Sequence, residues 1–233
     1  MTHFLLSDAH NNKIKFDQLC SVALKISPDA HFMLGGDMLD RGKRENGSGI
    51  DIIITAMDSN RYTYLLGNHE QMMMDALSID GSIIRDERAF LKWVLSGGSP
   101  TFEYFKLLSK VQKRNIMEFL HTRNDHMHLT LSDGRKFLLS HAWPKDDNYL
   151  WGIPPQMGLS VWEGDENLVM GHVFTLRLFK DQQAHLDVLQ ASGDHLRIFH
   201  GNNFTVTDCG CGHDLSVARL SMLCLESGEE FYV

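Results

Sequence analysis

The stretch HFMLGGDMLDRG, residues 31–42, decides how the rest of the chain is interpreted. Its apolar start, His31–Leu34, runs directly into glycines, two aspartates and an arginine. A short apolar run that ends in glycine and aspartate is typical of a buried strand leading into a loop. A simple turn closed by an Asp–Arg pair is the alternative, but the spacing of Asp37, Asp40 and Arg41 is far more specific than such a turn requires. We therefore expect this loop to carry function.

Four other apolar runs end in a similar polar cluster. They are His3–Leu6 before Ser-Asp-Ala-His, Tyr62–Leu66 before Gly-Asn-His-Glu, Lys136–Leu139 before Ser-His-Ala, and Asn167–Met170 before Gly-His. Apolar residues at helical spacing predict helices between the early strands and after the third, at Asn12–Ile26, Ile50–Met57 and Gln71–Ile79. The opening section is therefore β-α-β-α-β, which favours adjacent strands with helices packed over the sheet.

The later sequence predicts an insert, a hairpin and further strands. Residues 83–123 carry three helical stripes and are expected to form a helical insert over one edge of the sheet. Ser132-Asp133-Gly134 between two apolar runs predicts a hairpin, and the stretch 144–166 is expected to be a long surface loop. The alternating pattern from Ala184 onward favours mixed or antiparallel strands. We expect one α/β domain, residues 1–233, with the insert inside it.

The composition argues against some classes of function but does not identify one. With 233 residues, 43% of them hydrophobic, the chain can bury a full α/β core. The formal charge of −8 argues against a broad electrostatic grip on nucleic acid, although bound cations would let an acidic enzyme handle phosphate. The apolar start is too short for a signal peptide, and no stretch is long enough to cross a membrane. The four cysteines form no C-x-x-C pair, so we expect a reduced, cytoplasmic protein without membrane or nucleic-acid partners.

Six polar residues that follow the predicted strands form a candidate metal site. Open α/β sheets place ligands beyond the carboxyl ends of their strands, so these side chains converge if the strands share a sheet. Carboxylate, imidazole and amide groups together suit Mn, Fe or Zn better than Ca, and a shared carboxylate can bridge two cations. Each motif alone has a simpler explanation, such as a helix cap at Asn68, but five in one chain are hard to dismiss. The candidate ligands are Asp8, His10, Asp37, Asn68, His141 and His172.

In this order, the motifs resemble a known family. D-x-H at 8–10, G-D-x-x-D-R-G at 36–42, G-N-H-E at 67–70 and two later histidines are similar to the signature of metallophosphoesterases of the phosphoprotein-phosphatase, or calcineurin-like, type. The likeness covers nearly the whole chain and is nearest to the lambda-phage-type bacterial Ser/Thr protein phosphatases. Bacterial diadenosine-tetraphosphate hydrolases share the pattern. The resemblance implies mixed β-sheets packed face to face with flanking helices, and two divalent metal ions, with Mn the first choice and Fe or Zn as alternatives.

The resemblance also implies a role for each motif residue. The first metal would be held by Asp8, His10 and Asp37, and the second by Asp37, Asn68, His141 and His172. A hydroxide bridging the two metals would attack phosphorus, and His69 would protonate the leaving group as general acid. Asp40 would orient His69, and Arg41 would hold a phosphate oxygen. The substrate would be a phosphorylated protein or a small phosphoester.

Several positions depart from the family pattern. Ser7 and Asn11 stand where glycines are usual, and Leu66 replaces an arginine before Gly-Asn-His-Glu. A further phosphate-binding arginine is missing near Gly164. Because a neutral side chain does not readily replace a bidentate arginine, the usual phosphomonoester pose is in doubt. Arg177 is a candidate substitute, although a surface arginine is the simpler interpretation.

A cysteine-rich segment, Cys209-Gly210-Cys211-Gly212-His213, has two interpretations. It could be a soft metal or redox element, because thiolates and imidazole bind zinc. Two cysteines supply only half of a structural zinc site, and the sequence has no second pair, so local packing is favoured. His213 is nonetheless a candidate to reach toward the metal site.

Three functional hypotheses remain open. The first is a phosphomonoesterase of the Ser/Thr protein phosphatase type. The second is a dinucleoside polyphosphate hydrolase, for which Trp143, Trp151 and Trp162 are candidate base-stacking surfaces. The third is a metal-binding relative without activity, motivated by the missing arginines and opposed by the intact His69 and Asp40. The sequence does not predict an oligomeric state.

Overall fold

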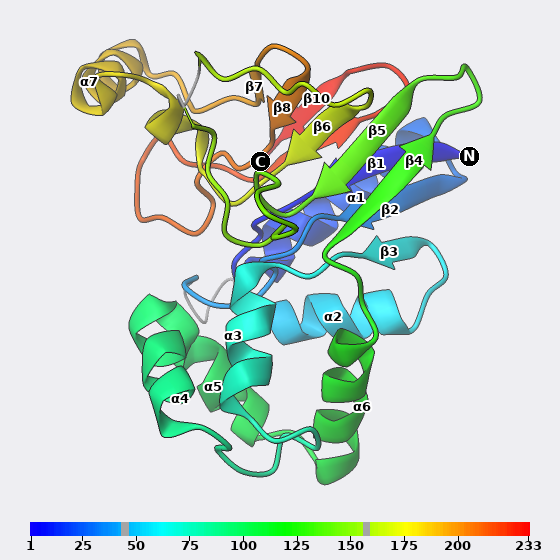
Figure 1. Ribbon diagram of the computed structural model, residues 1–233, viewed down its shortest axis with the longest axis vertical. Coiled ribbons are helices and arrows are strands. Elements are labelled where there is room, and N and C mark those ends of the chain that lie inside the picture. Colours follow the sequence, from blue (N-terminus) through cyan, green and yellow to red (C-terminus); the bar gives the residue numbers. More distant parts are fainter. Residues whose placement is uncertain (43–46, 156–158) are drawn as a thin grey trace.

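The computed structural model describes residues 1–42, 47–155 and 159–233, which form two five-stranded sheets with helices around them (Figure 1). The first sheet has the strand order β10-β9-β1-β2-β3 and the second the order β4-β5-β6-β8-β7. Both sheets contain parallel and antiparallel pairs. The predicted α/β class with mixed sheets and flanking helices is therefore confirmed.

The first sheet is built around the predicted β-α-β-α-β unit. Its parallel strands are β1 (Thr2–Leu6), β2 (Ala30–Leu34) and β3 (Tyr62–Tyr64), and it is extended beside β1 by the antiparallel strands β9 (Ser221–Cys224) and β10 (Glu230–Tyr232). The helices that follow the parallel strands are α1 (Lys13–Ile26), α2 (Gly49–Met57) and α3 (Asn68–Ala76). The side chains of Asn12 and Ser48 accept backbone hydrogen bonds at the starts of α1 and α2, which is why these helices begin directly after their loops.

Side-chain alternation along the strands divides the core into layers. In β1, Phe4 and Leu6 pack with helices α1 to α3, whereas Leu5 belongs to the cluster between the two sheets. In the second sheet, Leu139 faces that inner cluster and Leu138 faces an outer one. Successive residues of a strand point to opposite faces, so a strand buried on both faces has a continuous apolar sequence. This burial is the physical basis of the apolar runs from which the strands were predicted.

The second sheet carries the two later histidine loops. Its strands are β4 (His126–Thr130), β5 (Lys136–Ser140), β6 (Asn167–Met170), β7 (Phe199–His200) and β8 (Phe204–Val206), and β4 with β5 forms the predicted hairpin. The five ligand-bearing strands therefore do not share one sheet, because three belong to the first sheet and two to the second. Their loops still meet, since the carboxylate of Asp8 after β1 accepts hydrogen bonds from the backbone N–H of His172 after β6.

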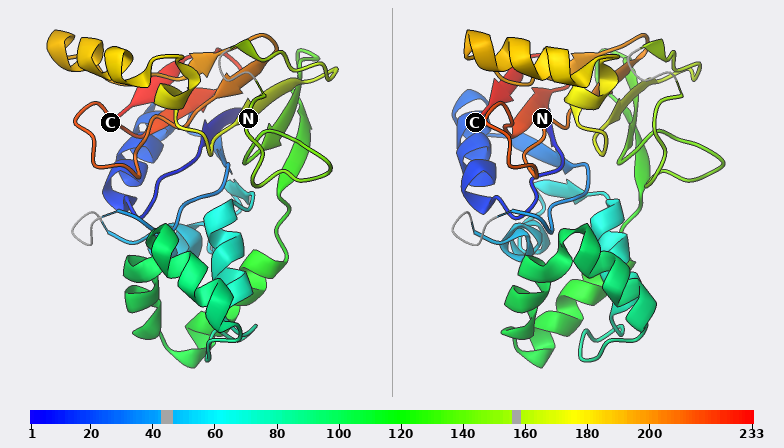
Figure 2. Two further views of the ribbon diagram at one scale, coloured as in Figure 1. Left: turned by 60° about the vertical axis from the view of Figure 1, so that its left-hand side comes forward. Right: turned by 90° about the vertical axis from the view of Figure 1, so that its left-hand side faces the viewer.

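The helical insert lies beyond the β3 edge of the first sheet and contacts α2 and α3 (Figures 1 and 2). It contains α4 (Glu87–Trp93), α5 (Ser99–Lys106) and α6 (Lys110–His121). Between α4 and α5, Val94–Gly98 forms a π-helical turn in which Gly97 has a φ of 106°. Such turns are frequently found at functional sites, and this one contacts the loop after β2.

One prediction for the C-terminal part was wrong. Gln182–Ser192 forms helix α7 after the short 3-10 helix η4 (Thr175–Leu178), where strands were expected from Ala184 onward. Asp181 caps the start of α7, and Gly193 ends it with a φ of 73°. No residue of α7 is fully buried, and Leu186 and Leu189 pack only partly buried against the cluster between the sheets, so the apolar stripe of this helix is a weak signal.

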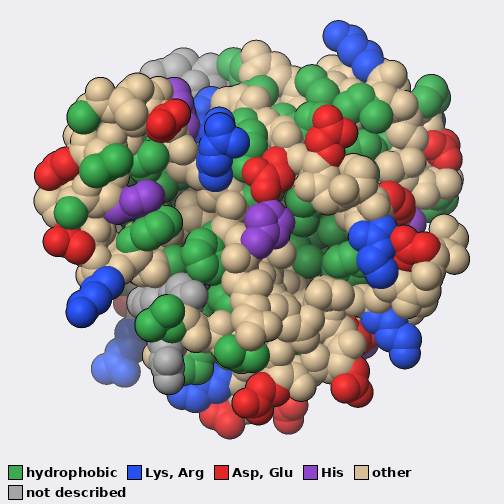
Figure 3. All heavy atoms as spheres, turned by 90° about the horizontal axis from the view of Figure 1, so that it is seen from above, with side chains coloured by type: hydrophobic (Ala, Val, Ile, Leu, Met, Phe, Trp, Pro, Cys, Tyr) green, Lys and Arg blue, Asp and Glu red, His purple; other side chains and the backbone are tan. Residues whose placement is uncertain are grey.

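Two features of the surface bear on possible partners. Among the described residues, no helix has the length and apolar content needed to cross a membrane. On the face seen in Figure 3, Lys and Arg side chains lie apart from one another and are interspersed with Asp and Glu. That face therefore does not present a continuous basic area.

Candidate metal centre

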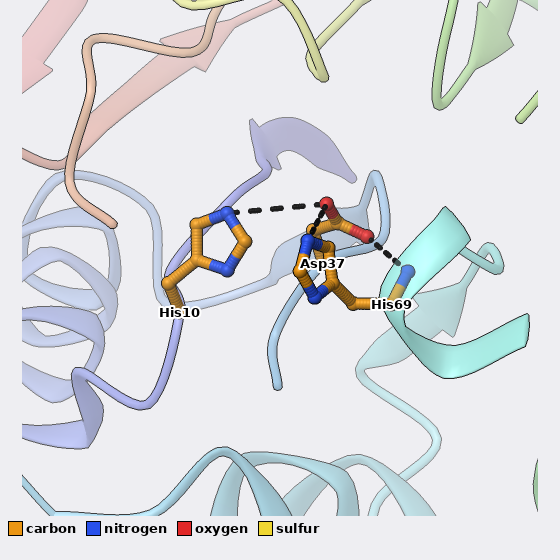
Figure 4. A group of neighbouring side chains, drawn as sticks. All are labelled: His10, Asp37 and His69. Atoms are coloured by element: carbon orange, nitrogen blue, oxygen red, sulfur yellow. Dashed lines mark hydrogen bonds and ion pairs between the residues drawn. The ribbon is translucent and has the colours of Figure 1, made fainter. Parts of the chain in front are cut away.

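Asp37 lies at the centre of the candidate site. It follows β2, and its Oδ2 is 3.9 Å from Nε2 of His10, 3.8 Å from Nε2 of His69 and 3.4 Å from Nε2 of His141. Figure 4 shows that the rings of His10 and His69 both turn a nitrogen toward this carboxylate. The other oxygen, Oδ1, accepts a hydrogen bond of 2.9 Å from the backbone N–H of His69. Asp37 thus ties the loop after β2 to the start of α3.

Two groups of potential metal ligands share Asp37. One group is His10, Asp37 and His69, the other is Asp37, His141 and His172, and in each the candidate ligand atoms lie within 4.8 Å of one another. Asn68 joins the second group, because its Oδ1 is 2.9 Å from Nε2 of His141 and 2.9 Å from Nδ1 of His172. A carboxylate shared between two such groups is the arrangement found in two-metal sites.

Backbone carbonyl groups fix the orientation of two of the histidines. Nδ1 of His10 lies 2.8 Å from the carbonyl oxygen of Leu39, and Nδ1 of His141 lies 2.9 Å from that of Gly35. A carbonyl oxygen only accepts a hydrogen bond, so Nδ1 carries the hydrogen in each ring and Nε2 is directed into the site. Metal-binding histidines ordinarily have a partner of this kind, and these rings therefore fit the role.

The site also concentrates buried carboxyl groups. Five acidic residues there are at most 3% exposed: Asp8, Asp37, Asp40, Glu70 and Asp208. Burial, with a contribution from Asp208, raises the pKa of Asp8 well above its ordinary value, and burial raises the pKa of Asp208 to about 6. Buried carboxylates without enough positive partners are costly, and divalent cations would offset their charge. The donor set therefore fits two divalent cations.

The structure brings five of the six predicted ligands together and places the sixth beside them. The carboxylate oxygens of Asp8 lie 3.1 and 3.2 Å from the backbone nitrogen of His172, and Asp8 belongs to neither of the two groups around Asp37. Asp208, which was not predicted, is the additional carboxyl group. It follows β8 with the same pattern as the other motifs, an apolar run that ends in a polar cluster, and that pattern would have identified it.

Several site residues have an unusual backbone conformation. Non-glycine residues rarely adopt a positive φ, and strain of this kind clusters at functional sites. The φ angles are between 45° and 71° at Asp8, His10, Asp37, Asp40, Arg41 and His172.

Two glycines allow the backbone to lie close to the carboxylates of the site. A Cβ on Gly67 would lie 2.1 Å from Oδ1 of Asp37, and one on Gly171 would lie 2.0 Å from Oδ2 of Asp8.

His69 differs from the other histidines because its partner is a carboxylate. Its Nδ1 lies 2.7 Å from Oδ2 of Asp40, and the same oxygen accepts a hydrogen bond of 2.7 Å from the indole nitrogen of Trp93. Burial lowers the pKa of His69, but Asp37 and Asp40 raise it more, so the pKa lies above its ordinary value. The ring can therefore hold a proton, and its Nε2 faces the centre of the site.

Glu70 organises both loops around Asp37. Its buried carboxylate accepts hydrogen bonds from the backbone N–H groups of Asp37 at 2.8 Å, Met38 at 2.9 Å and Gly67 at 2.9 Å. It also accepts one from the hydroxyl of Tyr64 at 3.1 Å. The helix-cap interpretation of Asn68 is wrong by one residue, because Gly67 is the cap of α3. Glu70 lies in the first turn of α3 and also joins two loops that are far apart in the sequence.

Two departures from the family pattern prove to be structural links. Ser7 is buried, and its hydroxyl lies 2.8 Å from that of Thr207 at the end of β8, so it joins the two sheets. Asn11 accepts a hydrogen bond of 2.7 Å from the backbone N–H of Gly49 and donates one of 3.2 Å to Thr101 of α5. The hydroxyl of Thr101 in turn accepts a hydrogen bond from the backbone N–H of Asp40 at 2.9 Å.

Neither of the two positions that lack an arginine of the family pattern carries a cationic side chain. Leu66 is buried in the core between the first sheet and its helices. The exposed Arg177 holds its guanidinium 5.3 Å from the ring of Phe174, and the ring of His213 lies 4.3 Å from the same phenyl group. Arg177 and His213 therefore lie beside the loop that carries His172, on the same aromatic ring.

The cysteines of the 209–213 segment belong to neither group of metal ligands. All four cysteines of the chain are free thiols, and burial raises the pKa of Cys209 and of Cys211 to about 12. The thiol of Cys211 lies 3.6 Å from the carbonyl oxygen of Ala9, next to the first motif. Protonated, buried thiols favour the packing interpretation.

Comparison with known proteins agrees with this geometry. No protein-family model matches the chain. Over 160 residues the chain is 26% identical to serine/threonine-protein phosphatase 2 of Salmonella typhimurium, a match that spans 66% of this chain and 65% of that protein. A crystal structure of a candidate diadenosine tetraphosphatase has a TM-score of 0.61 at 13% identity, covering 100% of this chain and 92% of that one. A metallophosphoesterase from Sphaerobacter thermophilus has a TM-score of 0.57 at 13% identity, covering 100% and 88%.

The chain therefore has the calcineurin-like metallophosphoesterase fold, and the resemblance predicted from its motifs is confirmed. The matched region spans 65% of the length of the Salmonella phosphatase. The relatives by sequence and by structure are phosphatases and phosphoesterases.

Proposed function

We propose that the protein is a metal-dependent phosphoester hydrolase, and specifically a phosphomonoesterase of the Ser/Thr protein phosphatase type. The observation that carries the proposal is the buried Asp37, which is shared by two histidine groups and lies beside the hydrogen-bonded His69 and Asp40. The match to the Salmonella phosphatase supports the class of reaction. An inactive relative would have no evident need to keep the contact between His69 and Asp40.

We assign metal-binding, phosphate-binding and proton-donor roles to the residues of the site. One cation would be held by His10 and Asp37 with Asp8 nearby, and the other by Asp37, Asn68, His141 and His172. When bound, such cations supply charge for the phosphoryl oxygens and lower the pKa of the attacking water. Nη1 of Arg41 lies 3.3 Å from Nε2 of His10, a position from which it can bind a phosphoryl oxygen. His69 donates its Nε2 proton to the departing oxygen while Asp40 holds Nδ1 in place.

Four finer assignments belong to the same proposal. Mixed oxygen and nitrogen donors suit Mn, Fe or Zn, and among these we propose Mn²⁺, which the family resemblance implies as the first choice. The four free thiols support a reducing, cytoplasmic location. The net charge of −8 supports the absence of a nucleic-acid partner. The contacts of the insert with α2 and α3 support a single domain over residues 1–233.

The test is hydrolysis by protein that is stripped with a chelator and reconstituted with Mn²⁺, measured as inorganic phosphate for a phosphopeptide and as ADP, or AMP and ATP, for diadenosine tetraphosphate. A phosphoserine peptide and diadenosine tetraphosphate are offered in parallel. Metal-dependent turnover of the peptide is expected, and Asp37→Asn should reduce it to background because the shared carboxylate is lost. Asp17→Asn makes the same chemical change at an exposed surface position and should leave turnover unchanged.

The two substrates separate the hypotheses. Preference for diadenosine tetraphosphate would replace the phosphomonoesterase by the dinucleoside polyphosphate hydrolase. Metal binding without turnover of either substrate would favour an inactive relative.

A further inference from the structure

One exposed tryptophan stands next to the metal centre. The ring centroid of Trp151 lies 6.2 Å from that of His172, with the two planes at 82°. Trp151 is 40% exposed, whereas Trp143 is buried and packs edge to face against Trp162 at 5.6 Å. Of the three tryptophans considered from the sequence, only Trp151 therefore offers indole surface beside a candidate metal ligand.

The backbone around Trp151 is anchored to the site. Oδ1 of Asn148 accepts hydrogen bonds of 3.0 Å from the backbone N–H groups of both Leu150 and Trp151. The carbonyl oxygens of Tyr149 and Gly152 accept hydrogen bonds of 2.8 and 3.2 Å from Ala142 and Trp143, the two residues after His141. The indole is thus held at a fixed place relative to His141 and His172, which lowers the entropy cost of binding against it.

A lysine from the helical insert completes this surface. Nζ of Lys92, an exposed residue of α4, lies 4.4 Å from the centroid of the Trp151 ring. A cation over an indole is attracted by the electrons of the ring, so the two side chains hold each other in place. The contact also puts a positive charge at the rim of the metal centre, where a negatively charged phosphoester would arrive.

We propose that Trp151, with Lys92 over its ring, binds a planar aromatic ring carried by the phosphoester at the metal centre. Phosphoesters that carry such a ring close to the phosphate, including phosphopeptides with an aromatic flanking residue, then bind more tightly than phosphoesters without one. Aromatic rings gain from offset or edge-to-face contact with an indole beyond the burial of area, and an alkyl chain lacks this contribution. The inference rests on the proposed function, because it adds a ring-binding site for the substrate of the same reaction.

The test measures binding separately from turnover. Isothermal titration of the Mn²⁺-reconstituted protein compares benzylphosphonate with butylphosphonate, which share the anion and differ in the ring. Trp151→Leu should weaken benzylphosphonate binding about ten-fold and butylphosphonate binding less than two-fold, while Trp151→Phe should lose about three-fold. The methylenephosphonate analogue of adenosine monophosphate, in which a methylene group replaces the ester oxygen and prevents hydrolysis, forms a third arm. If Trp151→Leu weakens binding of the adenosine ligand as well, the site accepts a nucleobase or a phenyl ring. If it weakens binding of benzylphosphonate alone, the site accepts only a phenyl ring.

Lys92 has a matched control on the same insert. Lys106 lies with its Nζ 5.1 Å from the ring of Phe102, the same kind of contact away from Trp151. Lys92→Met should weaken benzylphosphonate binding, whereas Lys106→Met should not. Equal losses of both phosphonates in Trp151→Leu, or no loss in a variant with unchanged thermal stability, would overturn the proposal. Ring-selective binding in a protein that hydrolyses no phosphoester would uphold this binding site and refute the proposed hydrolase.

Discussion

At the scale of single residues, the histidines of the site differ by the partner of their second ring nitrogen. His10 and His141 have backbone carbonyls as partners, whereas Nδ1 of His69 is held 2.7 Å from a carboxylate oxygen of Asp40. A carboxylate partner on Nδ1 favours the protonated ring, and Nε2 of His69 remains available to deliver that proton, whereas Nε2 of His10 and of His141 would bind metal. The three side chains are chemically alike, and their surroundings give them different tasks.

This difference predicts how His69→Asn affects substrates with different leaving groups. The variant should lower kcat on an alkyl phosphate by about 10²- to 10⁴-fold, the usual contribution of a general acid. The loss on p-nitrophenyl phosphate should be much smaller, because p-nitrophenolate departs without needing a proton. Steady-state kinetics on both esters measures the effect, and Asp40→Asn should show the same selectivity to a smaller extent. Equal losses on the two esters would argue that His69 binds metal instead.

The candidate metal ligands could be predicted because each lies in the segment that follows a buried strand. His10, Asp37, Asn68, His141 and His172 were all found in this way and lie together in the structure. Glu70 was not predicted as a site residue, because its hydrogen bonds to Asp37, Met38 and Tyr64 depend on the packing of two loops. A sequence shows which side chains are present, but not which distant backbone groups they will reach.

At the scale of elements, the helical insert holds the candidate catalytic residues in place rather than only covering an edge of the sheet. Trp93 of α4 donates to Asp40 across a separation of 53 residues. The carbonyl oxygen of Gly97 in the π-helical turn accepts a hydrogen bond of 2.9 Å from the backbone N–H of Arg41, and Thr101 of α5 holds the N–H of Asp40. The sequence predicted the helices of the insert, but these contacts depend on tertiary structure and could not be predicted from periodicity.

We therefore expect Trp93→Phe to impair catalysis more than folding. The variant keeps an aromatic ring but removes the indole N–H that orients Asp40, so kcat on an alkyl phosphate should fall about ten-fold with KM nearly unchanged. Phe90→Leu is the control, because the ring centroid of Phe90 lies 6.1 Å from that of Trp93 and a phenyl ring cannot donate a hydrogen bond to Asp40. Kinetics and thermal unfolding of both variants are compared. A loss of kcat in Phe90→Leu as large as that in Trp93→Phe would show that general packing is responsible.

At the scale of the whole molecule, the metal centre joins two sheets, and its charges link stability to pH. Without metal, His141 provides one of the positive partners of Asp37. Burial lowers the pKa of His141, but Asp37 and Asp8 raise it more, to about 10 from an ordinary value of 6.5. A histidine whose folded pKa is raised stabilises the fold fully below its unfolded pKa, and this contribution is lost as the pH rises through the folded pKa.

Metal-free protein should therefore lose stability as the pH rises above about 6.5, by at most roughly 1.4 kcal/mol per pH unit for one proton. The pH dependence of stability can be assigned to His141 only up to about pH 8.5, because above this pH the thiols of the unfolded chain ionise and add their own pH dependence. Chemical unfolding in the presence of a chelator measures this slope, and His141→Gln should flatten it. Added Mn²⁺ should also flatten it, because the cation takes the place of the proton as partner of Asp37. A slope that is unchanged in His141→Gln would assign the pH dependence to other groups and leave the contact between the two sheets independent of the charge on His141.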